Sequence, residues 1–391
     1  MNVLIISSAC IVGVNRTPYK ILSSLDNINL TLLIPYRKSE VNTHNGISDI
    51  ENCGFPIILS EISGIHPRLE KINNLKKVVE TVKPDVILLE FDVATIMMYE
   101  TIKFSKKYNS KITFIALENF NRNFLVETLL AAIQLKLRKT IGAFLTYLLY
   151  KYNKNKIDLV FCVSDDGLEA MKYLGFNINK IVKIPLGIDT ELFYPFNYEK
   201  VKELRKKLNL NKITIAYFGR IIPEKGLDNL IYSLNNIRNI EWELLVDNFN
   251  SYKSEYLNTL KDTIIKYRLQ ERIRYFDAIH SEMPNFINCA DIVVLPSKTN
   301  SKFKEQYGRV VAEALCCGKI VLVSNSGALP ELIGDVGFIF EKENIKELSE
   351  KLKYLIENHE QVKKDLFPKI IDRGTNLLSA KTQANIIYKN L

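Results

Sequence analysis

Two glutamates, Glu305 and Glu313, stand in the stretch FKEQYGRVVAEALCCG with seven residues between them. Gly318 is a suitable helix C-terminus, so the pattern predicts a helix over 308–317 with Glu313 in its second turn and Glu305 in the loop before it. Paired carboxylates accept hydrogen bonds from vicinal hydroxyls, which sugars and ribose both carry. The N-terminus of the helix, at 307–310, offers N–H groups and a positive dipole to a phosphate. Two ordinary surface glutamates are the alternative interpretation.

Two cations follow a predicted strand in YFGRIIPEKGLDNLI. Gly219 lets a ligand approach the backbone, and Arg220 comes next. Lys225 lies in the same loop, ahead of a predicted helix. An arginine fork and a lysine point charge together suit a diphosphate, although a solvated basic turn would have the same composition.

A third strand-end loop is VSNSGALPELI, in which Pro330 and Glu331 open a helix after Gly327. Its backbone N–H groups are expected to face the same edge of the sheet. The order of the three loops, with ADIVVLPS between the first two, resembles the retaining glycosyltransferases of family 4, within the glycosyl transferases group 1. The resemblance covers the second half of the chain closely and the segment PLGIDTELFYP more loosely.

The resemblance implies a GT-B fold, in which two Rossmann-like doubly wound α/β domains face a central cleft that holds a nucleotide-sugar. It implies no cofactor, no required metal, and a UDP- or GDP-linked donor. Arg220 and Lys225 would hold the donor diphosphate, and Glu305 would bind the sugar hydroxyls, which makes these three the predicted catalytic residues. Glu313 would bind ribose. The other predicted donor-binding residues are Gly219, Tyr307, Gly308, Arg309, Gly327, Ala328 and Leu329.

Short apolar runs alternate with longer amphipathic ones, which is typical of parallel sheets covered by helices. Twelve strands are predicted: 3–7, 30–35, 86–90, 112–117, 159–163, 181–185, 213–218, 242–246, 273–276, 292–296, 320–323 and 337–340. Helices are predicted over 69–81, 124–150 and 345–358, among others. Twelve strands exceed one compact domain. We therefore expect an acceptor-binding domain over 1–190 with a returning helix at 376–391, and a nucleotide-sugar domain over 191–375.

The first half conforms less well to the family. Gly13, Asn15 and Arg16 follow the first strand and are predicted to line the cleft, although an ordinary loop is an equal alternative. Many family members carry a His-Asp pair after the strand FIAL, with the His on the donor sugar. Glu118 and Asn119 stand there in this chain and are predicted to line the cleft of the first domain. Glu118 could accept a hydrogen bond from a sugar or acceptor hydroxyl, but the role of the His cannot be transferred to it, so the role of this position stays open.

The composition of the chain limits the partners, the metal sites and the cellular compartment that are expected. The 391 residues are 47% hydrophobic, and a formal net charge of +9 favours anionic partners. Six cysteines without a CxxC pair disfavour a zinc site and indicate free thiols in a reducing cytoplasm. The start MNVLIISSAC is interpreted as a buried first strand, with a signal segment as the alternative. No apolar run approaches the roughly 20 residues of a spanning helix.

Residues 121–156 hold seven Lys or Arg and one acidic residue, Glu127, among many apolar residues. Such a helix is suited to an anionic membrane surface, unless its basic face is merely solvated. Nucleic acid is not expected, because no binding motif is present.

The sequence therefore predicts a cytoplasmic glycosyltransferase, peripheral on the inner face of the plasma membrane. The resemblance to family 4 implies that it transfers a sugar with retention and without metal, from a nucleotide diphosphate sugar to a glycan or lipid-linked acceptor in polysaccharide or glycolipid synthesis. The alternative is a non-catalytic scaffold of a glycan assembly complex that binds nucleotide-sugar or membrane.

Overall fold

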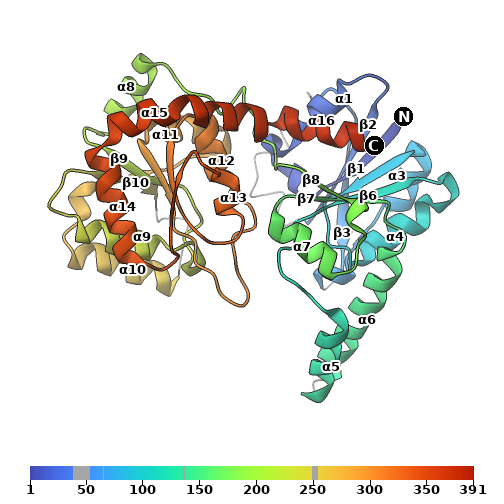
Figure 1. Ribbon diagram of the computed structural model, residues 1–391. Coiled ribbons are helices and arrows are strands. Elements are labelled where there is room, and N and C mark those ends of the chain that lie inside the picture. Colours follow the sequence, from blue (N-terminus) through green and yellow to red (C-terminus); the bar gives the residue numbers. More distant parts are fainter. Residues whose placement is uncertain (38–52, 65, 135–136, 249–253) are drawn as a thin grey trace. The chain divides into compact units, whose positions relative to one another are not determined.

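The computed structural model describes residues 1–37, 53–64, 66–134, 137–248 and 254–391. The chain divides into two compact units, one of residues 1–185 with 383–391 and one of residues 186–382 (Figure 1). We call these unit 1 and unit 2. The first division falls slightly before the domain boundary predicted after residue 190, and the chain returns to unit 1 within its last helix.

Unit 1 contains an eight-stranded sheet of order β4-β3-β2-β1-β5-β6-β7-β8. All neighbouring strands are parallel except β3 and β4. The strands are β1 (Asn2–Ile6), β2 (Asn29–Tyr36), β3 (Ile57–Ser63), β4 (Lys71–Ile72), β5 (Val86–Leu89), β6 (Lys111–Ala116), β7 (Leu159–Cys162) and β8 (Ile181–Lys183). The helices are α1 (Thr17–Ser23), α3 (Leu75–Val82), α4 (Ile96–Ser105), α5 (Phe124–Ile133), α6 (Leu137–Lys154) and α7 (Asp165–Tyr173).

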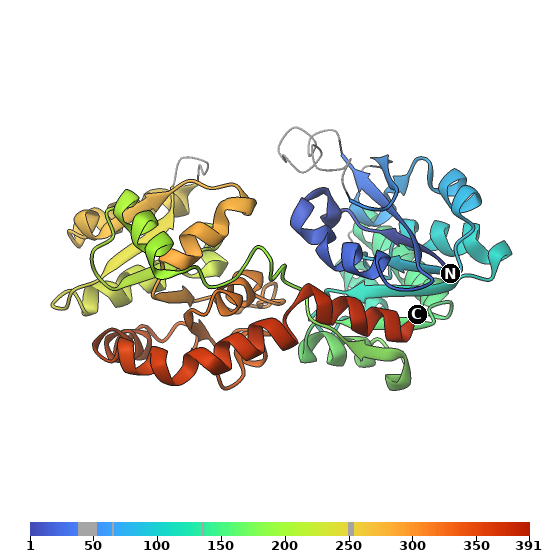
Figure 2. The ribbon, with the colours of Figure 1, turned by 90° about the horizontal axis from the view of Figure 1, so that it is seen from above.

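Unit 2 contains a six-stranded parallel sheet of order β11-β10-β9-β12-β13-β14. Its strands are β9 (Thr214–Tyr217), β10 (Glu243–Asp247), β11 (Ile273–Phe276), β12 (Ile292–Leu295), β13 (Ile320–Ser324) and β14 (Phe338–Phe340). Its helices are α8 (Tyr198–Lys207), α9 (Leu227–Asn236), α10 (Glu255–Lys266), α11 (Met283–Cys289), α12 (Arg309–Cys316), α13 (Leu329–Ile333), α14 (Ile345–Glu357) and α15 (His359–Asp372). Both sheets have helices on their two faces, as two orthogonal views show (Figure 1, Figure 2).

The final helix, α16 (Ala380–Asn390), brings the C-terminus back to unit 1. Within unit 1, Lys111 Nζ donates to the carbonyl of Asn390 at 2.7 Å, and Tyr388 Oη lies 3.5 Å from the carbonyl of Asp26. The predicted returning helix is therefore present, and these contacts attach its end to the first sheet.

All twelve predicted strands are present. A parallel strand that is buried on both faces needs a continuous apolar run, and these runs made the strands recognisable in the sequence. Two further strands were not predicted. β3 has a polar, half-exposed face, and β4 is only two residues long, inside the helix predicted over 69–81. The helix predicted over 124–150 is two helices, α5 and α6. All six cysteines are buried free thiols.

Each unit forms its own apolar core. Trp242, the only tryptophan, is fully buried in unit 2 beside β9, β10 and α9. None of the helices in the part of the chain that the structure describes combines the length and the apolar character needed to cross a membrane.

Candidate donor site in unit 2

The predicted donor-binding residues gather at one edge of the unit 2 sheet. In that sheet the strand order reverses between β9 and β12, and ligands of doubly wound folds bind at the carboxyl ends of strands at such a point. The loop with Arg220 and Lys225 follows β9, Ser297 follows β12, and Gly327 follows β13. Three loops that are distant in the sequence therefore meet because their strands are neighbours.

Lys225 and Glu305 form a buried ion pair at this edge. Lys225 Nζ lies 2.6 Å from Glu305 Oε2, and the two side chains are only 12% and 8% exposed. Ser297 Oγ donates to the same oxygen at 2.6 Å. An ammonium has three N–H donors and Glu305 receives one, so the pair is compatible with a further anionic ligand on Lys225.

Two glycines let the loops approach this closely. Gly226 has φ +70°, and a Cβ there would lie 2.0 Å from the carbonyl oxygen of Pro296. Gly327 has φ +53°, and a Cβ there would lie 2.0 Å from the carbonyl oxygen of Glu305. No side chain fits at these distances, so both positions require glycine. They hold the β9 and β13 loops against the chain that carries Glu305.

Arg220 differs from Lys225. Its side chain is exposed, and no ion pair with it is found among the described residues. The Tyr217 hydroxyl donates to its backbone carbonyl at 2.8 Å, which fixes the turn after Gly219. Arg220 is therefore an exposed cation at this edge.

Three of the predicted donor-binding residues, Gly308, Ala328 and Leu329, have defined backbone contacts within unit 2. Gly308, with φ +84°, is the N-cap of α12, which agrees with the predicted helix. Ala328 N–H already donates to the Glu305 carbonyl at 3.0 Å, and Leu329 N–H to the Ser326 carbonyl at 3.3 Å. These two hydrogen bonds hold the loop together, and the contact of Ala328 and Leu329 with a donor stays a prediction.

A second buried carboxylate lies on α12. Arg309 Nε donates to Glu313 Oε1 at 3.1 Å, and His280 Nε2 is 3.4 Å from the same oxygen. Burial raises the pKa of Glu313 from 4.5 to about 7, and Arg309 opposes this shift. Burial and the charge of Arg309 lower the pKa of His280. Tyr307, just before α12, is buried as well, and burial raises its pKa. Glu313 therefore changes charge near neutral pH.

The predicted residues after β1 have mainly structural contacts. The Arg16 side chain is fully buried, and its guanidinium donates to the carbonyls of Cys10 at 2.7 Å and Ile11 at 3.0 Å. It holds the loop from inside unit 1, so it does not line a surface as predicted. Asn15 Nδ2 donates to the Ala9 carbonyl at 2.7 Å, and Gly13 begins a short 3₁₀ turn without a positive φ.

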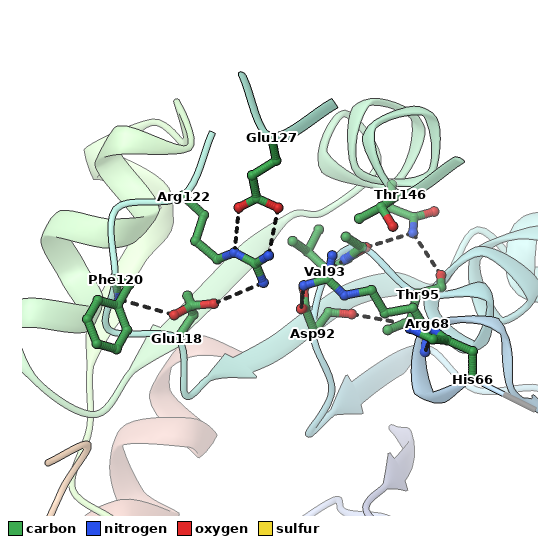
Figure 3. A network of polar contacts seen from close by, with 12 residues as sticks. His66, Arg68, Asp92, Val93, Thr95, Glu118, Phe120, Arg122, Glu127 and Thr146 are labelled. Atoms are coloured by element: carbon green, nitrogen blue, oxygen red, sulfur yellow. Dashed lines mark hydrogen bonds and ion pairs between the residues drawn. The ribbon is translucent and has the colours of Figure 1, made fainter. Parts of the chain in front are cut away.

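Glu118 belongs to a charged network after β5 and β6 of unit 1 (Figure 3). Its Oε1 accepts from the N–H groups of Asn119 and Phe120 at 3.2 and 3.1 Å, and its Oε2 is 3.7 Å from Arg122 Nη1. Arg122 also binds both oxygens of Glu127, at 3.0 and 2.8 Å. Asn119 itself is buried. Glu118 thus stabilises its own turn.

Two serines of the unit 2 site, Ser297 and Ser326, were not predicted, and neither was the contact of His280 with Glu313. Ser297 contacts Glu305, Ser326 Oγ accepts from Glu305 N–H at 3.3 Å, and His280 contacts Glu313. Each serine lies two residues after the end of its strand, β12 or β13, so this place after a strand was the available signal. His280 belongs to another loop, and no spacing rule connects it with Glu313. No cluster of metal-ligating side chains occurs in the described ranges.

Comparisons with known proteins show which proteins this chain is similar to. Residues 200–365 match the family model described as Glycosyl transferases group 1. A Campylobacter jejuni protein, N,N'-diacetylbacillosaminyl-diphospho-undecaprenol alpha-1,3-N-acetylgalactosaminyltransferase, is 29% identical over 220 residues, 54% of each chain. The capsular polysaccharide biosynthesis glycosyltransferase CapM of Staphylococcus aureus is 27% identical over 266 residues, 65% of this chain and 66% of CapM. The chain thus spans about half to two thirds of these relatives.

Solved structures extend the likeness to both units. A glycosyltransferase from Rickettsia africae superimposes with a TM-score of 0.76 at 17% identity, over 99% of this chain and 97% of that one. Anabaena HepE in complex with UDP gives 0.74 at 18% identity, over 100% and 99%. At such identities the likeness concerns the fold, which is GT-B with two Rossmann-like domains.

Proposed function

We propose, from the match of residues 200–365 to the family model Glycosyl transferases group 1, that this chain transfers a sugar from a nucleotide diphosphate sugar to a glycan or lipid-linked acceptor. The setting would be the synthesis of surface polysaccharide or glycolipid on the cytoplasmic side of the membrane. The names of the Campylobacter and Staphylococcus relatives support this class of acceptor. UDP and GDP are the first nucleotides to test, since a relative from Mycobacterium tuberculosis is named as GDP-mannose-dependent and HepE was solved with UDP.

The observation that carries the proposal is the Lys225–Glu305–Ser297 cluster beside Arg220. Breaking the anomeric C–O bond leaves negative charge on the diphosphate and positive character on the sugar. Arg220 and Lys225 would stabilise the diphosphate as it leaves, and fixed cations at that point lower the barrier most. They would take the part that a metal ion has in other transferases, so we propose a metal-independent reaction.

Glu305 would bind the donor sugar, and Glu313 the ribose. The pair Lys225–Glu305 would link the diphosphate end of the donor to its sugar end, because one carboxylate oxygen holds the lysine and the same carboxylate would accept a hydrogen bond from a sugar hydroxyl. We further propose that the acceptor attacks from the side of the leaving diphosphate, which retains the anomeric configuration.

A thermal-shift screen tests donor binding first. Each nucleotide-sugar would be compared with its bare nucleotide in the presence of EDTA, since a ligand of the folded state raises the melting temperature. We expect one nucleotide-sugar to stabilise the protein without metal. Transfer to a lipid-linked acceptor, followed by proton NMR of the new linkage, would then establish retention. Binding without any transfer or hydrolysis would support the non-catalytic scaffold instead.

A further inference from the structure

The hairpin of α5 and α6 carries apolar side chains that the fold leaves exposed. Both helices project from the rest of unit 1 (Figure 1). The exposed residues are Leu125, Val126, Leu129, Leu130 and Ile133 on α5, and Leu137, Ile141, Phe144, Leu145, Leu148 and Tyr152 on α6. Proteins rarely leave contiguous apolar patches of this kind in water unless they bind something.

The exposed residues follow helical spacing. On each helix they recur at three or four positions, so each helix presents one apolar face. The most exposed of these residues are Ile133, the last residue of α5, at 76%, and Leu137, the first residue of α6, at 73%. We call Ile133 and Leu137 the tip.

The base of the hairpin is firmly attached to unit 1. Phe124 is buried with its ring 5.0 Å from that of Tyr150, and Asn153 Nδ2 donates to the Val93 carbonyl at 2.7 Å. Arg68 and Arg122 lie over the Phe124 ring, 5.3 and 5.1 Å from its centroid. A rigid base and an apolar outer part are the properties of a docking element rather than of a loosely packed core.

Charge indicates the kind of partner. Residues 121–156 contain seven basic residues and one acidic residue, Glu127, which is bound by Arg122. Lys139 and Lys151 are exposed, and Lys151 follows Leu148 by three positions, so it borders the apolar face. A second copy of the hairpin would place cations against cations in a symmetric interface. An anionic bilayer complements both the apolar faces and the lysines.

We propose that the α5–α6 hairpin docks on an anionic membrane, with its apolar faces at the boundary between headgroups and acyl chains and Lys139 and Lys151 at the lipid phosphates. The inference does not depend on glycosyl transfer. It goes beyond the sequence-based expectation because it identifies the tip and the face that enter the lipid.

Vesicle sedimentation of the full chain tests the proposal. Vesicles of phosphatidylcholine with about one third phosphatidylglycerol are compared with vesicles of phosphatidylcholine alone. The tip variant, Ile133→Ser with Leu137→Ser, should bind the anionic vesicles about tenfold more weakly or worse. Its matched control, Tyr198→Ser with Ile265→Ser, removes two exposed apolar side chains of unit 2 and should bind like the wild type.

Two further measurements separate insertion from other outcomes. Lys139→Glu with Lys151→Glu should weaken binding to the anionic vesicles alone. In Phe144→Trp the added tryptophan should show a blue-shifted emission on binding, against the constant background of buried Trp242. The proposal is overturned if the wild type sediments with neither vesicle, if the tip variant binds unchanged, or if Phe144→Trp shows no shift. It is also overturned if sedimentation velocity shows a dimer that only the tip variant dissociates, because a second copy would then cover this face.

Discussion

Both units have charged side chains at the carboxyl ends of their parallel strands, but the charged pairs differ in their exposure and in the sequence separation of their partners. In unit 2, the side chains of Lys225 and Glu305 are only 12% and 8% exposed and come from positions 80 residues apart. In unit 1, Arg122 joins Glu118 and Glu127, which lie within five positions of it, and all three side chains are about a quarter or more exposed. A buried ion pair is weak evidence for stability, because its desolvation cost offsets its attraction. Our hypothesis is therefore that the Lys225–Glu305 pair of unit 2 binds the reacting end of the donor. The network of unit 1 would have only a local structural role.

The largest effect is expected from removing both cations of the β9 loop. Arg220→Ala with Lys225→Ala should lower kcat/KM about a thousandfold or more, since one lost electrostatic contact to the transition state costs about 10²–10³. Steady-state transfer assays measure this. Arg220→Ala alone is the second variant to measure, because Arg220 is exposed and its substitution should leave the fold intact. Lys346→Ala with Lys353→Ala, two exposed cations on α14, is the matched control and should be fully active. Full activity in the double variant would remove the proposed mechanism.

Glu305→Gln addresses the division of roles inside unit 2. It should lower kcat/KM about a hundredfold and leave the affinity for the bare nucleotide nearly unchanged, because Glu305 is assigned to the sugar. Calorimetric titration with nucleotide and with nucleotide-sugar checks this. Loss of the partner of buried Lys225 should also reduce the free energy of unfolding, by about 3 kcal/mol. An equal loss of nucleotide affinity would contradict the assignment.

Glu313 sharpens the comparison through pH. Its pKa is about 7 in the folded protein against an ordinary 4.5, so the folded state binds a proton more tightly than the unfolded state. The contribution of this carboxyl to stability is therefore full below about pH 4.5 and is lost as the pH rises through 7. Glu313→Gln should stabilise the protein relative to wild type by on the order of 3 kcal/mol more at pH 8 than at pH 4.5. Urea unfolding at the two pH values measures the difference. The same difference at both values would show that Glu313 does not titrate as stated.

The fold was largely predictable because its signals are local. Continuous apolar runs marked the buried parallel strands, and Gly308 and Gly318 marked the ends of α12. The strands β3 and β4 were not predicted. β3 has a polar face, and β4 pairs with it over only two residues at the edge of the sheet. The break between α5 and α6 escaped for a different reason, since the apolar pattern continues through it.

The site was predictable only in part. The positions of Arg220, Lys225 and Glu305 followed from motif order, but their relation did not. Nothing in the sequence says that Lys225 and Glu305 bind each other, or that Ser297 shares the same oxygen, because these contacts depend on loop packing around Gly226 and Gly327. Arg16 shows the opposite case, where a cation after the first strand is buried among backbone carbonyls.

The smallest effect is expected in unit 1. Glu118→Ala removes a partly exposed contact of 3.7 Å to Arg122, which retains its bidentate pair with Glu127. Exposed pairs contribute about 0.2–1 kcal/mol, so the free energy of unfolding should fall by less than about 1 kcal/mol. The turn at Asn119 and Phe120 also loses its acceptor, which Glu118→Gln would preserve. Urea unfolding and transfer kinetics of the two variants are compared. If Glu118→Ala lost more than about tenfold in kcat/KM while the fold stayed intact, and Glu118→Gln did not restore it, the carboxylate would act on a substrate. The contrast between a reactive unit 2 and a merely structural network in unit 1 would then be wrong.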